Sequence, residues 1–135
     1  MARPAFRRLS VALAGGGVGG LANGLAIWLA GETGLTALLG VRLAPELTPM
    51  FLYSRIVWGA LWGLLFFLPT GRLAPPARGF LLSLAPTLVQ LLVVYPLRTP
   101  AGPFGGLGSL TPAVVVAANA VWGIAASWWV SRSVW

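Results

Sequence analysis

The sequence predicts an all-α integral membrane protein, a four-transmembrane-helix bundle built from two parallel helical-hairpin repeats. Composition is the first reason: the 135 residues are 58% hydrophobic and only 8% charged, whereas soluble proteins carry about 25% charged residues. The second reason is that the apolar residues gather into four long runs. The third is an internal repeat, in which Leu-Thr-Pro precedes Trp-Gly twice. We therefore expect one transmembrane domain over residues 1–135.

Four segments are expected to span the membrane, near residues 10–30, 49–68, 78–97 and 112–131. A helix needs about 20 predominantly apolar residues to cross roughly 30 Å of hydrocarbon. Thr48-Pro49 and Thr111-Pro112 predict helix starts, with Thr as the N-cap and Pro at the first helical position. Pro86 lies inside the third span and is expected to kink it.

The first span is the weakest of the four predictions. Its glycine-rich stretch at 15–20 lowers helix propensity. A cleaved signal peptide is an alternative interpretation, because Arg3, Arg7 and Arg8 precede an apolar run of suitable length. We expect an uncleaved transmembrane helix.

The arginines predict the orientation of the chain. With the N-terminus inside, the cytoplasmic flanks hold Arg3, Arg7, Arg8, Arg72, Arg78 and Arg132. The outer flanks then hold only Arg42 and Arg98. Cytoplasmic loops carry an excess of positive charge, so both termini are expected in the cytoplasm and the chain in the cell (inner) membrane as a multi-pass protein.

The repeat divides the chain into halves at about 10–68 and 78–131. Leu47-Thr48-Pro49 and Trp58-Gly59 in the first half recur as Leu110-Thr111-Pro112 and Trp122-Gly123 in the second. Each half holds two spans, so both copies run in the same direction, which is the parallel type of repeat.

Each span carries one strongly hydrogen-bonding side chain, and these are Asn23, Arg55, Gln90 and Asn119. A rise of 1.5 Å per residue places all four roughly 9–10 Å below the outer ends of their helices. Polar groups are costly in hydrocarbon and usually face the bundle interior. We therefore expect the four side chains, called the polar quartet below, to meet in one layer.

Two interpretations of the polar quartet remain open. In the first, Arg55 and the amides form an outward-facing site, either a passive channel or a binding site for an anion or a small polar solute. In the second, the amides only join helices, at about 0.6 kcal/mol each. Arg55 then reaches up to Glu46, Glu32 or a lipid phosphate.

The tryptophans and glycines suggest packing roles. Trp58 and Trp122 lie about 14–15 Å below their helix starts, and an indole N–H at that depth needs an acceptor, for which the Asn and Gln carbonyls are candidates. Trp62 shares a helix face with Arg55 and Trp58, so the tryptophans either line a pore or pack. Glycines four residues apart predict close helix packing, and they are Gly16, Gly20, Gly24, Gly59 and Gly63. Gly123 is expected to pack in the same way, because it is the repeat counterpart of Gly59.

Two outer loops are also notable. Residues 31–48 contain enough apolar side chains for a short interfacial helix. The Gly/Pro-rich run at 98–111 could fold over the mouth of the bundle, although an ordinary surface connection is the default for a loop.

The residue inventory excludes several classes of function. The chain has no Cys, His, Asp or Lys, so metal sites, His-based acid–base chemistry and thiolate nucleophiles are not expected, and neither is a cofactor. An enzyme is therefore not expected. The arginines are scattered between apolar runs, which argues against nucleic acid as a partner.

The expected partners are membrane lipids, a small anion, and either further copies of the chain or a larger membrane complex. A non-catalytic structural or assembly subunit of such a complex is the alternative function. Lipid or pigment binding by the aromatic side chains is a third possibility.

Overall fold

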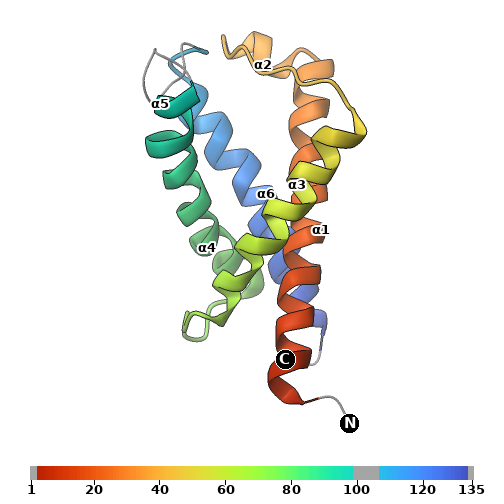
Figure 1. Cartoon of the computed structure of the whole chain (residues 1–135). Coiled ribbons are helices and arrows are strands. Elements are labelled where there is room, and N and C mark those ends of the chain that lie inside the picture. Colours follow the sequence, from red (N-terminus) through yellow and green to blue (C-terminus); the bar gives the residue numbers. More distant parts are fainter. Residues whose placement is uncertain (1–2, 99–106, 134–135) are drawn as a thin grey trace.

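The computed structural model describes residues 3–98 and 107–133, and this part of the chain is helical without strands (Figure 1). Four helical segments are long and apolar enough to cross a membrane. Their elements, with one short helix between the first two, are α1 (Pro4–Glu32), α2 (Leu35–Leu38), α3 (Pro49–Trp62) with the 3₁₀ turn η1 (Gly63–Phe67), α4 (Pro75–Val89) with the π-helical η2 (Gln90–Val94) and α5 (Tyr95–Arg98), and α6 (Thr111–Arg132).

The spans agree with the sequence expectation in number and differ at their ends. The first helix begins at Pro4 and stays regular through its glycine-rich stretch, because neighbouring helices bury most of those glycines. The second changes to 3₁₀ geometry at Gly63. The third widens into a π-helix four residues after Pro86 and continues to Arg98, one residue past the predicted end.

The two Thr-Pro helix starts behave differently. Thr48 is the N-cap of α3, as predicted, and its hydroxyl accepts from the backbone N–H of Phe51 at 3.1 Å. Thr111 is not an N-cap, because α6 already includes it and Leu110 takes the cap position. The Thr111 hydroxyl is instead buried, with no hydrogen-bond partner in the described part of the chain. The prediction for this second start is therefore wrong by one residue.

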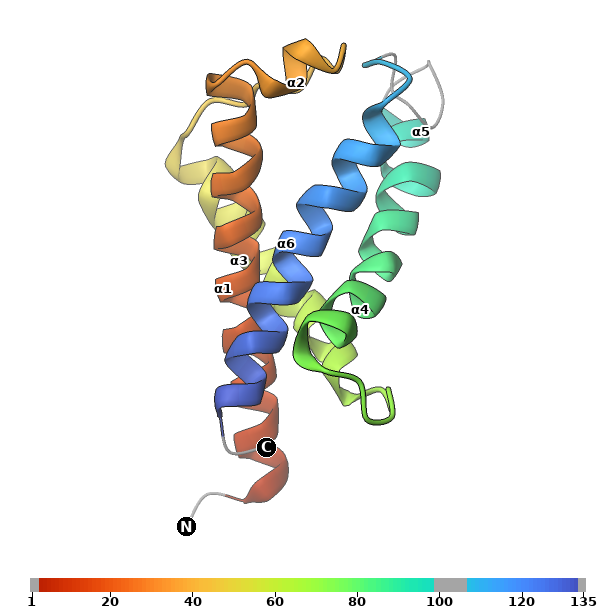
Figure 2. The same ribbon diagram turned by 180° about the vertical axis from the view of Figure 1, so that it is seen from behind.

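Three neighbouring pairs of long segments pack closely, and the second and third segments meet at η1, where Arg78 of α4 donates to the Phe66 carbonyl at 2.8 Å. α1 packs against α3 on one side and α6 on the other, and α4 packs against the far side of α6. The α1–α3 pair and the α4–α6 pair diverge toward the end that carries α2, as Figures 1 and 2 show. α1 begins and α6 ends at the opposite end of the molecule (Figure 1).

Glycines bring α1 and α3 together. A Cβ added to Gly16 would collide with the backbone of Gly59 and Gly63, and one added to Gly20 would collide with the Arg55 carbonyl. Gly24 lies against the Arg55 side chain. The glycines predicted on these two helices therefore lie at their crossing, where backbone atoms replace side chains as the contact surface.

A second glycine contact joins α4 to α6. Gly123 meets Gly79, and a Cβ on either residue would collide with the backbone of the other. The sequence pattern indicated Gly123 but not Gly79, because Gly79 has no glycine four residues away.

The end of the bundle near the chain termini has a packed apolar core. Phe66, Leu82, Trp122, Ala126 and Val130 are buried together there, and the rings of Phe66 and Trp122 lie 6.2 Å apart, tilted by 51°. This core fills the space between the helices on that side. The polar quartet lies on the other side of Trp122, toward the diverging ends of the helices.

Candidate functional site

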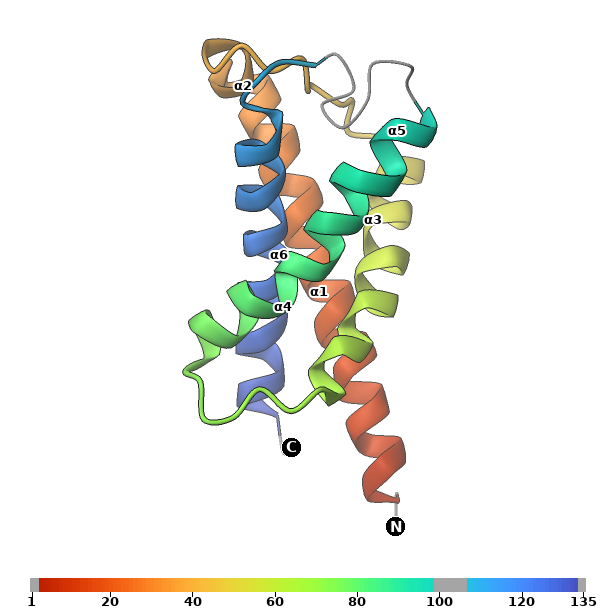
Figure 3. The same cartoon turned by 90° about the vertical axis from the view of Figure 1, so that its left-hand side faces the viewer.

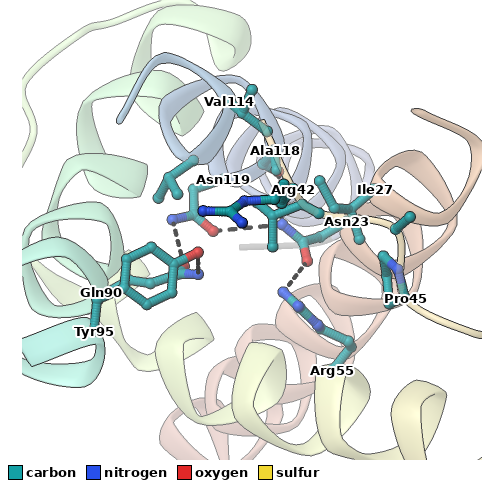
Figure 4. A pocket seen from close by; sticks show the side chains of 13 residues that line it. Asn23, Ile27, Arg42, Pro45, Arg55, Gln90, Tyr95, Val114, Ala118 and Asn119 are labelled. Carbon is teal, nitrogen blue, oxygen red and sulfur yellow. Dashed lines mark hydrogen bonds between the residues drawn. The ribbon is translucent and has the colours of Figure 1, made fainter. Parts of the chain in front are cut away.

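The polar quartet meets between the diverging helix pairs. Asn23 comes from α1, Arg55 from α3, Gln90 from η2 and Asn119 from α6. Figure 4 shows the four side chains turned toward one another and joined by hydrogen bonds. Residues far apart in the sequence therefore form one polar layer.

Two buried amides form the centre of this layer. Asn23 is 4% exposed and Asn119 is 7% exposed. Asn23 Nδ2 donates to Asn119 Oδ1 at 3.4 Å and to the carbonyl of Ala118 at 2.8 Å. Asn119 Nδ2 in turn donates to the Thr87 hydroxyl at 3.1 Å. Leaving one such buried group unpaired costs about 1–3 kcal/mol, so the pair fixes how α1 and α6 meet.

The π-helical turn adds a tyrosine to the layer. Gln90 Oε1 accepts from Asn119 Nδ2 at 3.5 Å, and Gln90 Nε2 donates to the Tyr95 hydroxyl at 3.1 Å. Gln90 and Tyr95 are five residues apart, the spacing that the i→i+5 pattern of a π-helix brings onto one face. In a regular α-helix these side chains would point apart. π-Turns are frequent at functional sites.

Arg55 is the charged member of the layer. Its Nη1 donates to Asn23 Oδ1 at 2.9 Å, and its guanidinium carbon lies 5.0 Å from the centre of the Phe51 ring. Within residues 3–98 and 107–133 it makes no ion pair. Glu32 and Glu46, two of the three partners that the second interpretation offered, are both exposed and border neither cavity described below. The hydrogen bond that the structure shows is to the Asn23 amide instead, and a contact with lipid phosphate stays a prediction.

Two cavities adjoin the polar quartet. The first, called the loop cavity, holds about 280 Å³ and reaches residues 42–45 of the loop after α2. The second, called the lateral cavity, holds about 370 Å³ and is lined by residues of all four long segments, among them Trp58 of α3 and Arg98 of α5. The described residues that border both are Asn23, Arg55, Gln90 and Asn119. The quartet is therefore the boundary between the two spaces.

A second arginine borders the loop cavity. Arg42 extends toward the quartet (Figure 4), and its backbone N–H donates to the Leu107 carbonyl at 2.8 Å. The sequence placed Arg42 in the outer loop and gave no reason to assign it to the site. Its contribution depends on the path of the loop, which the pairing with Leu107 fixes. The cavity therefore has two guanidinium groups on its wall and no carboxylate among its described lining residues.

The tryptophans lie around the lateral cavity. Trp58, Trp62 and Trp122 all line it, but in different environments. Trp58 is 61% exposed, whereas Trp122 is buried at 3%. The Trp122 indole donates to the carbonyls of Gly16 and Gly59, at 3.1 and 3.2 Å. Its acceptors are thus backbone carbonyls of glycines, which have no side chain to cover them, and not the Asn and Gln side chains that the sequence suggested.

The loop predicted to cover the site falls mostly outside the described residues. The suggested lid at 98–111 includes residues 99–106, which lie outside the described residues. A short helix is present in residues 31–48, as predicted, and it is the four-residue α2; its interfacial position stays a prediction. Within α2, the Thr36 hydroxyl donates to the Leu43 carbonyl at 2.7 Å, which helps to hold the loop beside the cavity.

No protein family model, curated protein or solved structure matches the chain.

Proposed function

We propose that this chain is a small multi-pass inner-membrane protein that binds an anion, or a small polar solute carrying negative charge, at the polar quartet. The observation that carries the proposal is the shared boundary of the two cavities. Four helices deliver polar side chains to one accessible place, and the charged group there is a cation with no acidic partner among the described residues. Such donor-rich surroundings favour an anion.

The electrostatics support this choice. Arg55 and Arg42 are permanent cations, and the Asn and Gln amides add further N–H donors. A guanidinium in a partly dehydrated cavity attracts an anion more strongly than one in water, because the local dielectric is lower. Side chains that only join helices by hydrogen bonds would not require a charge, or a cavity of about 280 Å³ beside it.

We propose a binding site rather than a continuous pore. The packed core around Phe66, Trp122 and Val130 occupies the space between the quartet and the end where α1 begins. The cavities lie on the other side of this core. A solute would therefore enter from the α2 end and leave the same way.

The proposed orientation has both termini in the cytoplasm and the α2 end outside. The arginine distribution supports it, together with the position of the start of α1 and the end of α6 at one end of the molecule (Figure 1). The parallel repeat of two hairpins is supported by the matching packing, α1 on α3 and α4 on α6, each across glycines.

The test is anion-dependent stabilisation of the purified protein in detergent. A ligand that binds only the folded state raises its stability by RT ln(1 + [L]/Kd). Sodium phosphate is titrated against sodium gluconate at constant ionic strength while the Tm is followed. We expect the Tm to rise with phosphate in the unmodified protein and in Arg72→Gln, whose exposed side chain borders neither cavity.

Arg55→Gln should lose this response. The substitution removes the charge but keeps a hydrogen-bonding side chain, so the fold is retained while the anion loses its counter-charge. An equal phosphate response in Arg55→Gln and Arg72→Gln would contradict the proposed site. It would favour the alternative function of a structural subunit.

A further inference from the structure

Two arginines from different helices come together at the end of the bundle opposite α2. Arg8 lies in the second turn of α1 and Arg78 in the first turn of α4, and both helices begin at this end (Figure 3). The two like charges are close enough to repel each other. Glu32 and Glu46, the only acidic side chains in the sequence, lie toward the α2 end. The positive charge at this end is therefore built from arginines with no acidic side chain among them.

The two phenylalanines of η1 lie against these arginines. The guanidinium carbon of Arg78 is 5.1 Å from the centre of the Phe66 ring, and that of Arg8 is 6.0 Å from the centre of the Phe67 ring. Arg78 Nη2 also donates to the Phe66 carbonyl. Contact with an aromatic face stabilises a cation without neutralising it. The η1 turn therefore helps to position one guanidinium group from α1 and one from α4 beside each other.

Arg78 has more donors than its contacts within the protein use. A guanidinium carries five N–H groups. Within residues 3–98 and 107–133 the Phe66 carbonyl accepts from Nη2, and Nε has no hydrogen-bond partner. Nε itself is covered by protein, so only the terminal N–H groups can face a ligand. Arg78 is partly buried and Arg8 is exposed, so a ligand can reach the pair from the surface of the bundle.

We infer that Arg8 and Arg78 bind the phosphate group of an anionic phospholipid, at a site separate from the polar quartet. Planar guanidinium groups match the geometry of phosphate oxygens, and basic pockets between transmembrane helices bind lipid head groups. An anion between two neighbouring cations is attracted by both and offsets their mutual repulsion. The inference does not depend on the proposed function, because it uses other residues at the other end of the bundle.

The position of the pair favours a lipid over a soluble phosphate compound. Both arginines lie within the first two turns of segments that are long and apolar enough to cross a membrane, which is where such a helix meets the head-group region. Leu64 and Phe67 are three residues apart in η1, so the 3₁₀ geometry puts them on one face, and they are 43% and 45% exposed. This face offers apolar surface to the lipid chains.

The experiment compares three ligands that share a phosphate group. Phosphatidylglycerol, phosphatidylcholine and soluble glycerol phosphate are each titrated against the purified protein in a neutral detergent, and binding is read by native mass spectrometry and from the Tm. The choline cation offsets the phosphate charge in phosphatidylcholine, and glycerol phosphate has no chains. We expect phosphatidylglycerol to bind at least about fivefold more tightly than either, which corresponds to one charge interaction at a membrane surface.

Matched double variants separate the pair from the general positive charge of this end. Arg8→Gln combined with Arg78→Gln should weaken phosphatidylglycerol binding at least about fivefold. Arg7→Gln combined with Arg72→Gln removes the same charge from two exposed side chains. This control should weaken binding less than about twofold, because salt screens exposed charges that do not touch the ligand. Arg55→Gln, at the polar quartet, should leave lipid binding unchanged.

Three outcomes would overturn the inference. Equal losses in the two double variants would show that the lipid responds to total charge rather than to the pair. Glycerol phosphate binding as tightly as phosphatidylglycerol would assign the pair to a soluble compound. Loss of the lipid preference in Arg55→Gln would move the lipid to the polar quartet.

A single substitution keeps the test decisive if the double variant does not fold. Arg78→Gln loses the hydrogen bond to the Phe66 carbonyl, whereas the Arg8 side chain is exposed. Arg8→Gln is then compared with Arg7→Gln in the same assay, and equal lipid affinities would contradict the site. Because Arg55 is unchanged in both variants, the phosphate response of the polar quartet can fail or succeed independently of this result.

Discussion

Arg55 donates through Nη1 to Asn23 Oδ1 at 2.9 Å, so the charge that α3 brings to the polar layer is held by an amide rather than by a carboxylate. An amide orients the guanidinium without neutralising it. The positive charge therefore remains available to a ligand in the adjoining cavities.

Asn23→Asp tests whether this lack of neutralisation matters. The substitution keeps the shape of the side chain and its acceptor toward Arg55, and it adds the carboxylate that the layer lacks. It also removes the Nδ2 donor to Ala118 and Asn119, so stability without phosphate is measured beside the response. We expect the phosphate-induced rise in Tm to disappear, because an internal ion pair replaces the ligand. Without phosphate the protein should remain folded by circular dichroism. Retained phosphate binding in Asn23→Asp would show that the charge of Arg55 is not the attraction.

Trp122→Phe tests the indole hydrogen bonds to Gly16 and Gly59. The variant keeps most of the aromatic volume against Phe66 and removes one donor shared by two carbonyls. We expect a loss of about 1 kcal/mol in the free energy of unfolding, the usual net worth of a hydrogen bond. Trp58→Phe is the matched control, because Trp58 is exposed and should change stability much less. Equal losses in the two variants would contradict a structural role for the Trp122 indole.

Adjacent glycines of α1 give a matched pair of packing mutants. A Cβ on Gly16 would collide with the backbone of α3, whereas one on Gly17 would lie 3.6 Å from Ile56 Cγ2, an ordinary contact. Gly16→Ala is expected to destabilise by about 1–3 kcal/mol through overpacking. Gly17→Ala should be neutral or slightly stabilising, because alanine is the better helix former. Thermal unfolding of both variants checks the difference, and a neutral Gly16→Ala would argue against the close crossing.

The absence of cysteine from the whole sequence makes the proposed orientation easy to test, because a single introduced thiol has no background. Leu38 of α2 is 84% exposed, and Arg72 is exposed near the other end of the molecule. In intact cells, a membrane-impermeant maleimide should label Leu38→Cys fully and Arg72→Cys only after permeabilisation. The reverse pattern would place the termini outside.

Helix geometry was enough to predict that the polar quartet would meet. Counting 1.5 Å per residue from the helix ends put Asn23, Arg55, Gln90 and Asn119 at one depth, and the hydrogen bonds join these four side chains. The prediction worked because depth depends only on residue count, so an error of one residue at a helix end shifts it by only about 1.5 Å. Whether the quartet binds a solute remains a prediction.

Other members of the site could not be predicted from periodicity. Tyr95 joins the layer only because the helix widens after Pro86, and a reading based on 3.6 residues per turn assigns it to another face. Arg42 depends on the pairing of two loops far apart in the sequence. Nothing in the sequence pattern distinguishes Thr87, whose hydroxyl accepts from Asn119. Such contacts follow from tertiary packing, and a single sequence carries little sign of them.

Arginine can donate hydrogen bonds but cannot accept them, and this asymmetry extends well beyond Arg55. The oxygen of Asn23 must face the guanidinium, so its nitrogen faces Asn119. The oxygen of Asn119 then faces Asn23, and its nitrogen faces the Gln90 oxygen. The Gln90 nitrogen in turn donates to the Tyr95 hydroxyl. The Ala118 carbonyl can only accept, so it holds Asn23 in the same sense from α6. Reversing Asn23 would set donor against donor at Arg55 and acceptor against acceptor at Ala118. A cation on α3 and a carbonyl on α6 therefore agree on one arrangement of three amides, which continues to a hydroxyl on α5.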